Sequence, residues 1–194
     1  MNKSFKLGKY NIGEGYPPFI IAEMSGNHNQ SLERALKIVE AAASAGAHAI
    51  KLQTYTADTM TIDCDSEDFT ISNPDNLWAG RTLYDLYQEA HTPWDWHHEI
   101  FEFARELDMI PLSTPFDETA VDFLETLDTG IYKISSLENT DHALIKKVAQ
   151  TGKPIILSTG LMSKEDIIET VEVAKSAGCE DLILLKCTSS YPAK

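Results

Sequence analysis

Short apolar segments alternate with amphipathic helical patterns along most of the 194-residue chain. Most of these segments are hydrophobic at successive positions rather than at every second position, which is typical of parallel strands covered on both faces. Strand–helix alternation of this kind predicts an α/β fold with right-handed crossovers. Six strands are expected, at Phe19–Met24, Ala47–Gln53, Met109–Thr114, Gly130–Ser135, Pro154–Ser158 and Asp181–Cys187.

Capping signals mark the helices expected between these strands. Ser31, Asp117 and Ser163 each precede a helical pattern, and Ser163 with Asp166 forms a capping-box sequence. Thr92 precedes a proline at a first helical position. The expected helices cover residues 32–45, 81–90, 93–107, 118–127, 139–150 and 164–178.

Two architectures fit such an alternation, an open doubly wound sheet and a barrel. The turn after the first strand, SGNHNQ at 25–30, has one glycine and does not match a dinucleotide-binding fingerprint. Polar residues end each strand, as in barrels whose sites lie at the carboxyl ends of strands. We therefore predict a TIM (β/α)8-type barrel truncated after its sixth strand, because the full barrel has eight strands and about 250 residues. Residues 1–17 are expected to form an N-terminal hairpin beneath it, residues 18–194 the partial barrel, and residues 54–91 an elaborated loop.

The composition disfavours several functional classes. With 30 acidic and 16 basic residues, the chain has a formal charge of −14, whereas nucleic-acid and anionic-membrane binding require a basic surface. No apolar run approaches the roughly 18 residues of a membrane span, and the N-terminus lacks a signal-peptide core. The three cysteines lack metal-site spacing and are expected to be reduced thiols in a cytoplasmic protein.

Ionisable and hydroxyl side chains gather at the carboxyl ends of the predicted strands. Lys51 and Lys133 lie inside apolar strands, where an unpaired charge is costly. Parallel strands end at the same edge, so both lysines are expected at one barrel mouth, where cations and hydroxyl donors together suit a phosphate or carboxylate. The candidates at this mouth are Glu23, Lys51, Gln53, Thr114, Lys133, Ser135, Ser136, Glu138, Ser158, Lys186, Ser189 and Tyr191.

Some of these residues also fit a purely structural role. Glu23 could pair with a strand lysine, Lys186 could face a helix, and Ser158 could serve only its Ser-Thr-Gly turn.

The histidines and one cysteine near the mouth have similar alternatives. His97 and His98 are adjacent on a helix and point about 100° apart, which makes them a poor metal pair and favours packing or surface roles. His28 follows the first strand and fits a structural or a substrate-contacting role equally. Cys187 is expected to be a packed thiol rather than a nucleophile.

Several segments, in this order and spacing, resemble the sialic acid synthase family. They are FIIAEMSGNHNQSLERALKIVEAAASAGAHAIKLQTYTADTMT (19–61), STPFD (113–117), YKISSLE (132–138), KPIILSTGL (153–161) and LLKCTSSYP (184–192). Within that family, EMSGNHN (23–29), LWAGRTLYDLY (77–87) and TPWDWH (92–97) look closest to the pseudaminic acid synthases.

The resemblance implies an enzyme that condenses phosphoenolpyruvate with an N-acylated amino sugar in its aldehyde form and releases phosphate. For the pseudaminic branch the acceptor would be a 2,4-diacetamido-2,4,6-trideoxy altrose, with N-acetylneuraminate or legionaminate synthesis as alternatives. The resemblance also implies a divalent cation, Mn²⁺ or Mg²⁺, with ligands beyond residue 194. It further implies a homodimer and a C-terminal antifreeze-like domain that this sequence lacks. The 194-residue chain is therefore expected to be weakly active or inactive alone.

Matching positions carry the family's roles onto this sequence. Lys51, Thr114, Lys133, Ser136 and Ser158 match phosphoenolpyruvate-binding positions, and Ser189 stands where many members have Asn. Glu23, expected to be catalytic together with Lys51, matches a carboxylate that acts as acid–base or orients water. Gln53, Glu138 and Tyr191 match positions that face the sugar.

Two other functional classes stay open on the sequence. A barrel lysine at position 51, 133 or 186 could form a Schiff base, as in aldolases. The expected truncation also leaves room for a non-catalytic fragment or assembly partner.

Overall fold

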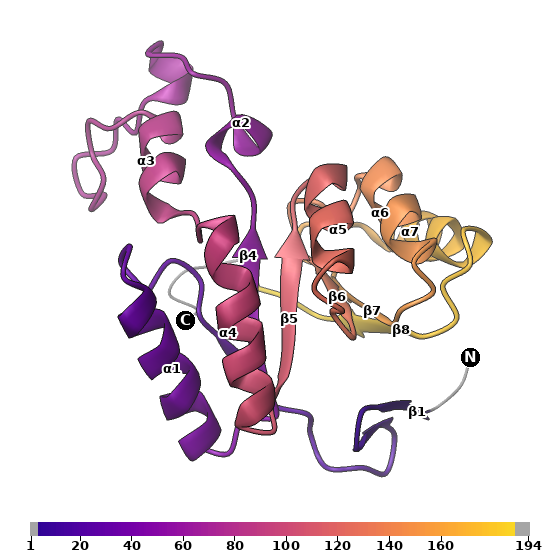
Figure 1. The fold of residues 1–194 in the computed structure, drawn as a ribbon. Helices are drawn as coiled ribbons and strands as arrows, with labels where there is room; N and C mark the ends of the chain where they lie inside the picture. Colours follow the sequence, from indigo (N-terminus) through magenta and orange to yellow (C-terminus); the bar gives the residue numbers. More distant parts are fainter. Residues whose placement is uncertain (1–3, 189–194) are drawn as a thin grey trace.

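A computed structural model describes residues 4–188 of the chain. Six parallel strands form one sheet in the order β3-β4-β5-β6-β7-β8, and helices cover its outer face (Figure 1). Sheet order follows chain order, as in a barrel, whereas a doubly wound sheet reverses direction. The predicted six-stranded partial barrel is confirmed, as an open half-barrel. Its strands are β3 (Ile21–Glu23), β4 (Ala49–Thr54), β5 (Ile110–Pro115), β6 (Tyr132–Ile134), β7 (Ile155–Ser158) and β8 (Leu182–Leu185).

The predicted capping residues begin their helices. The Ser31 hydroxyl accepts a hydrogen bond from the Arg34 amide. Asp117 caps the helix that begins at Glu118, and Ser163 forms a capping box with Asp166. These side chains accept from amides that have no partner inside the helix. The helices are α1 (Leu32–Ser44), α2 (Ala57–Met60), α3 (Leu83–Ala90), α4 (Trp94–Glu106), α5 (Glu118–Glu125), α6 (His142–Ala149) and α7 (Lys164–Ser176), with a 3₁₀ turn η1 (Glu67–Phe69).

Three helix starts differ from prediction. The helix expected over 81–90 begins at Leu83, because the Thr82 side chain caps it by accepting a hydrogen bond from the Asp85 amide. The helix predicted to begin at Pro93 begins one residue later, because Pro93 has a non-helical ψ of 132°. The helix expected over 139–150 begins at His142, because the Asp141 side chain accepts hydrogen bonds from the first backbone amides of α6. Asn139 therefore belongs to the loop that precedes α6.

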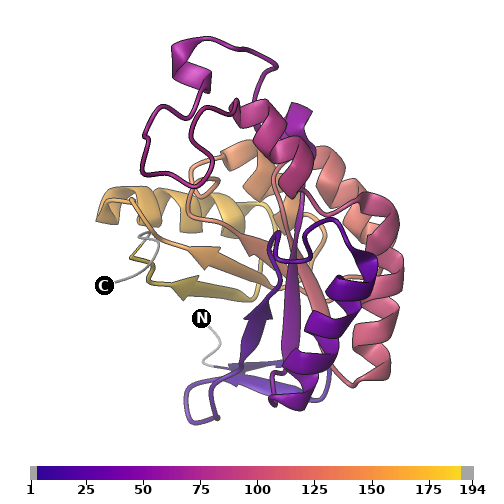
Figure 2. The same ribbon diagram turned by 90° about the vertical axis from the view of Figure 1, so that its left-hand side faces the viewer.

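An antiparallel hairpin, β1 (Ser4–Leu7) with β2 (Tyr10–Gly13), lies at the amino ends of the barrel strands (Figure 2). It occupies the segment where a hairpin was expected. Leu7 is 6% exposed and packs in a cluster with Ala49, Leu112 and Ile156 from three barrel strands. This contact covers the bottom of the half-barrel. The opposite, carboxyl end of the strands is the end available for a site.

An arm formed by residues 55–92 rises beyond the carboxyl end of β4 (Figures 1 and 2). It contains α2, η1 and α3, and polar contacts join its parts. Tyr84 donates a hydrogen bond to Asp58 at 2.9 Å, and Arg81 pairs with Glu89 at 2.6 Å. Among residues 4–188, no helix is both long and apolar enough to span a bilayer.

Candidate functional site

Lys51 is buried inside the half-barrel and is held by side chains from both neighbouring strands. Register pairs it with Glu23 of β3, and its Nζ lies 2.9 Å from Glu23 Oε2. The same Nζ lies 3.3 Å from Thr114 Oγ1 on β5. The Lys51 side chain is 8% exposed and that of Glu23 is 56% exposed. The ion pair expected as the structural alternative for Glu23 is therefore present, and its carboxylate remains open to solvent.

A second buried cation, Lys133, lies on β6 and contacts the neighbouring strand β7. Its Nζ donates to Ser158 Oγ at 2.5 Å and to the Ile134 carbonyl at 2.7 Å. Burial, and after it the nearby charge of Lys51, lowers the pKa of Lys133 to about 8. The Lys133 ammonium is thus a buried cation whose direct partners are a hydroxyl and a carbonyl, an environment typical of an anion-binding site.

Glu138 stands in the loop between β6 and α6 and is half-buried. Ser135 Oγ donates a hydrogen bond to it. Burial raises the pKa of Glu138 to about 7. At neutral pH this carboxyl group therefore exists in both protonation states, which suits a group that accepts or donates a hydrogen bond to a sugar.

The structure brings together most of the predicted site residues. Gln53, which the strand register pairs with Thr114, and Ser136 are half-buried near the carboxyl ends of their strands. Lys186 is exposed after β8, and Cys187 is half-buried rather than packed, with Sγ 3.6 Å from the Leu185 carbonyl. Ser189 and Tyr191 lie outside the described residues.

The two buried histidines have structural partners. His28 Nε2 lies 3.1 Å from Thr92 Oγ1, and the His28 ring packs edge-on against Trp96. His97 is buried against Phe101 and Phe123. The packing role predicted for His97 is confirmed, and the burial and contacts of His28 favour the structural one of its two expected roles.

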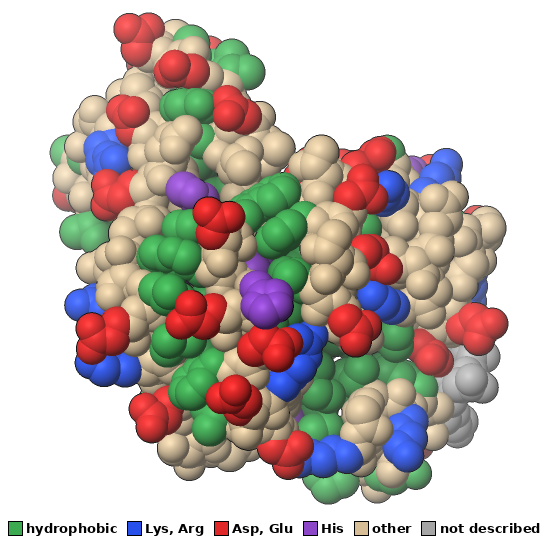
Figure 3. Space-filling model, viewed as in Figure 1, with side chains coloured by type: hydrophobic (Ala, Val, Ile, Leu, Met, Phe, Trp, Pro, Cys, Tyr) green, Lys and Arg blue, Asp and Glu red, His purple; other side chains and the backbone are tan. Residues whose placement is uncertain are grey.

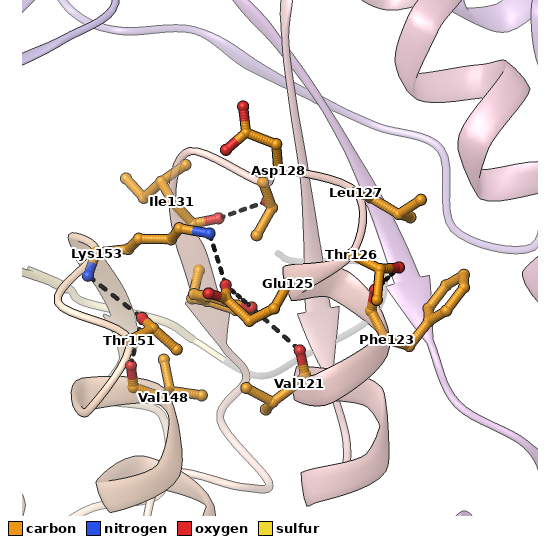
Figure 4. Close-up of polar contacts among 12 residues, drawn as sticks. Val121, Phe123, Glu125, Thr126, Leu127, Asp128, Ile131, Val148, Thr151 and Lys153 are labelled. Atoms are coloured by element: carbon orange, nitrogen blue, oxygen red, sulfur yellow. Dashed lines mark hydrogen bonds and ion pairs between the residues drawn. The ribbon is translucent and has the colours of Figure 1, made fainter.

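Residues next to the inward-facing site residues anchor the strands from outside. Tyr132 precedes Lys133 and is fully buried. Its hydroxyl donates to Glu125 at 2.7 Å, and Glu125 also accepts from Lys153 at 2.6 Å (Figure 4). This contact ties β6 to α5 and so helps to direct Lys133 to the other face. The alternation of side chains along a strand could have identified Tyr132 as an outward anchor.

On the helix-covered face shown in Figure 3, acidic side chains are scattered rather than gathered in one patch. Lys51 and Lys133, by contrast, are buried on the inner face, where the charge of Lys51 acts on Lys133. The candidate site therefore places two buried cations in a chain whose net charge is negative. This contrast favours an anionic ligand at the mouth.

Residues 4–188 contain no group of three or more His, Cys, Asp or Glu side chains placed to hold a metal ion. The described residues thus do not fit a metal site by themselves. A divalent-cation requirement stays a prediction.

A parallel half-barrel with buried lysines at the carboxyl edge of its strands is typical of α/β-barrel enzymes that act on anionic substrates. Within that class the chain belongs to the NeuB family, whose family model matches residues 38–194. The resemblance stated from the sequence motifs is thereby confirmed.

Named relatives and a solved structure agree with this assignment. Pseudaminic acid synthase from Campylobacter jejuni is 44% identical over 187 residues, which cover 96% of this chain and 53% of that protein. Pseudaminic acid synthase from Helicobacter pylori is 44% identical over 178 residues, covering 92% and 52%. The crystal structure of N-acetylneuraminic acid (sialic acid) synthetase from Leptospira borgpetersenii superposes with a TM-score of 0.84 at 29% identity, covering 98% of this chain and 61% of that one. The chain spans about half the length of the pseudaminic acid synthases it matches.

Proposed function

We propose that this chain forms the phosphoenolpyruvate-binding side of a nonulosonic acid synthase. The observation that carries the proposal is the pair of buried lysines at one mouth, each with a hydroxyl partner: Lys51 with Thr114, and Lys133 with Ser158. Phosphoenolpyruvate carries a phosphate and a carboxylate, so two separate cations match its two anionic ends. Ser136 and Ser189 are the further proposed ligands of this substrate.

The proposed reaction joins phosphoenolpyruvate to the aldehyde form of an N-acylated amino sugar. The C3 carbon of phosphoenolpyruvate attacks the aldehyde carbon, and the aldehyde oxygen takes up a proton to become a hydroxyl. Water adds to C2, the C2–O bond to phosphate breaks, and a 2-keto acid and inorganic phosphate result. The lysines and hydroxyls orient the anion and stabilise developing charge.

Glu23 is the proposed acid–base or water-orienting group. Its carboxylate is ionically paired with Lys51 yet 56% exposed, so a water molecule has access to it. Gln53, Glu138 and Tyr191 are the proposed contacts to the sugar. The half-burial and raised pKa of Glu138 support a polar contact at this position.

For the acceptor we propose 2,4-diacetamido-2,4,6-trideoxy altrose, the substrate of the pseudaminic branch. The support is the 44% identity to proteins named pseudaminic acid synthase. N-acetylneuraminate and legionaminate synthesis are the alternatives within the family. A homodimer, a cytoplasmic location and a Mn²⁺ or Mg²⁺ requirement belong to the same proposal, and the 194-residue chain alone is expected to turn over weakly or not at all.

Calorimetric titration of the purified chain with phosphoenolpyruvate tests the proposal. We expect saturable binding that Lys51→Met weakens about 100-fold, because loss of a buried charge partner costs several kcal/mol. Lys153→Met removes a lysine at the amino end of the strands, where Lys153 pairs with Glu125, and should leave affinity unchanged. Absence of binding by the chain would favour a non-catalytic assembly role. An acceptor panel on a full-length protein that contains this chain would distinguish altrose-type from mannosamine-type sugars.

A Schiff-base aldolase is the second candidate, and the pKa of about 8 at Lys133 favours it. A buried lysine with a lowered pKa has more neutral amine available to attack a carbonyl. Borohydride reduction in the presence of pyruvate separates the two candidates. A stable adduct on Lys133 would support the aldolase, whereas no adduct together with phosphoenolpyruvate binding would support the synthase.

A further inference from the structure

Asn139 is a buried amide in the loop between β6 and α6, immediately after Glu138. Its side chain Nδ2 donates to the Ser158 carbonyl at 3.1 Å and to the Gly160 carbonyl at 2.9 Å. Asn139 is 3% exposed. The amide therefore joins the loop that carries Glu138 to the turn that ends β7.

The contacts require the donor chemistry of an asparagine. Both N–H groups of the amide are directed at backbone carbonyls, and an aspartate at this position would present acceptors to acceptors. An alanine would leave two carbonyls of a buried turn without this donor. The backbone carbonyl of Asn139 accepts a further hydrogen bond, from Thr170 Oγ1 of α7 at 3.0 Å, so the residue is held on two sides.

The Ser158 carbonyl and the Ser158 hydroxyl belong to the same residue, and the hydroxyl receives the 2.5 Å hydrogen bond of Lys133. Restraining the carbonyl restrains the backbone from which the hydroxyl projects. The same side chain restrains the loop one residue after Glu138. Asn139 thus links the loop that carries Glu138 to Ser158, the residue that accepts the hydrogen bond of Lys133.

We propose that Asn139 is a positioning residue that holds Lys133 and Ser158 in the geometry for binding the substrate anion. This inference rests on the proposed function, because it assumes that phosphoenolpyruvate binds at Lys133. Asn139 itself is not placed in contact with the substrate. It acts through Ser158 and through the loop that carries Glu138.

The test uses Asn139→Asp, which is nearly isosteric, and Asn139→Ala, with Thr129→Val as the matched control. Thr129 is fully buried, and its hydroxyl donates to the Ile131 carbonyl at 3.2 Å, so the control also removes a buried side chain–backbone hydrogen bond, before β6 and away from the mouth. We expect both Asn139 variants to bind phosphoenolpyruvate about tenfold more weakly in calorimetry. The control should keep wild-type affinity even if its thermal midpoint falls as far as that of the Asn139 variants. Affinity that simply tracks the thermal midpoint across all three variants would indicate a structural role only.

A second measurement does not depend on phosphoenolpyruvate. Lys133 is 8% exposed, so acetylation by a succinimide ester, followed by mass spectrometry, should be slow at Lys133 relative to Lys153. We expect the Lys133 rate to rise about threefold or more in both Asn139 variants, because local opening exposes the amine, and to stay unchanged in Thr129→Val. If the wild-type chain binds no phosphoenolpyruvate, the proposed function fails while the labelling still tests Asn139. Unchanged labelling in both variants, or wild-type affinity in a chain that binds the substrate, would overturn the positioning role.

Discussion

The hydroxyl of Thr54, at the end of β4, lies 2.9 Å from Nε2 of His97 on α4, and both residues are fully buried. His97 Nδ1 lies 3.2 Å from the Pro93 carbonyl. A carbonyl only accepts, so Nδ1 carries the proton and Nε2 of the neutral ring accepts from Thr54. Ser113, 2.6 Å from Thr54 Oγ1, therefore donates to Thr54.

This chain of hydrogen bonds lies on the outer face of β4 and β5. Thr54 and Ser113 point toward α4, and their neighbours Gln53 and Thr114 consequently point to the other face. Register pairs Gln53 with Thr114. The buried histidine thus stabilises the strand alignment that the candidate site requires.

The first prediction concerns the pH dependence of folding stability at His97. Burial lowers its pKa to about 4, whereas the unfolded chain keeps about 6.5. Between these values the unfolded state binds the additional proton, so stability is complete above pH 6.5 and falls as pH decreases toward 4, by about 3 kcal/mol in total.

Urea denaturation across pH 4–7 measures this effect. His97→Gln should be less stable at pH 7 but should lack this part of the acid loss. His98→Gln changes an exposed neighbour and should keep the wild-type slope. An identical slope in His97→Gln would contradict the assignment.

The second prediction links the two lysines. The charge of Lys51 is one cause of the lowered pKa of Lys133, so Lys51→Met should raise that pKa from about 8 toward 10.5. Nuclear magnetic resonance of ¹³C-methylated lysines reports the titration directly. Lys153→Met should leave the pKa of Lys133 unchanged. If the pKa of Lys133 does not change in Lys51→Met either, the two ammonium groups are electrostatically independent.

The third prediction is that phosphoenolpyruvate binding weakens as pH rises past 8. Lys133 has a pKa of about 8, and its neutral form no longer attracts an anion. Affinity should fall about tenfold between pH 8 and pH 9.5. Calorimetric titration at several pH values measures it. In Lys133→Met this pH dependence should disappear along with most of the affinity, and a persisting transition would assign it to another group.

The fourth prediction is that Glu138→Gln stabilises the fold at pH 8. The pKa of Glu138 is about 7 in the folded chain and 4.5 in the unfolded chain, so above pH 7 the folded state bears an unfavourable buried charge. As pH falls from 7 to 4.5, the folded state takes up the proton and this penalty is relieved. After a reduction for the partial exposure of the carboxyl, we expect a gain of roughly 1–2 kcal/mol at pH 8.

Thermal and urea denaturation at pH 8 and pH 4.5 check the change at Glu138. The advantage of Glu138→Gln should shrink at pH 4.5. Glu172→Gln, at an exposed position of α7, is the matched control and should differ little from wild type at either pH. A destabilised Glu138→Gln at pH 8 would show that the carboxylate is held by compensating contacts.

Much of the fold was predictable because its signals are local. All six barrel strands lie where apolar segments predicted them, and Ser31, Asp117 and Ser163 cap helices as predicted. The start of α6 was misplaced because the predicted helix included Asn139–Asp141, whereas Asp141 caps α6 from outside the helix. Capping is decided by a few hydrogen bonds, which an apolar periodicity does not record.

Most residues of the candidate site could be predicted from the sequence, but their side-chain contacts could not. Lys51 and Lys133 stood out because charges are rare inside apolar strands. The sequence did not show which hydroxyl each lysine meets, because those contacts join strands 25 and 63 residues apart. It also did not show Asn139, since a polar residue in a loop is ordinary until the fold buries it.

The sequence by itself determined the strand–helix alternation, the placement of lysines among apolar residues and the family to which the chain belongs. Tertiary structure alone decided that Glu23 pairs with Lys51, that His97 is a neutral acceptor for Thr54, and that Glu138 has a pKa of about 7. Periodicity and capping depend on residues a few positions apart, which the sequence displays directly. Burial and charge–charge distance depend on strands that meet only when the sheet has formed, so pKa values and hydrogen-bond partners are properties of the folded chain.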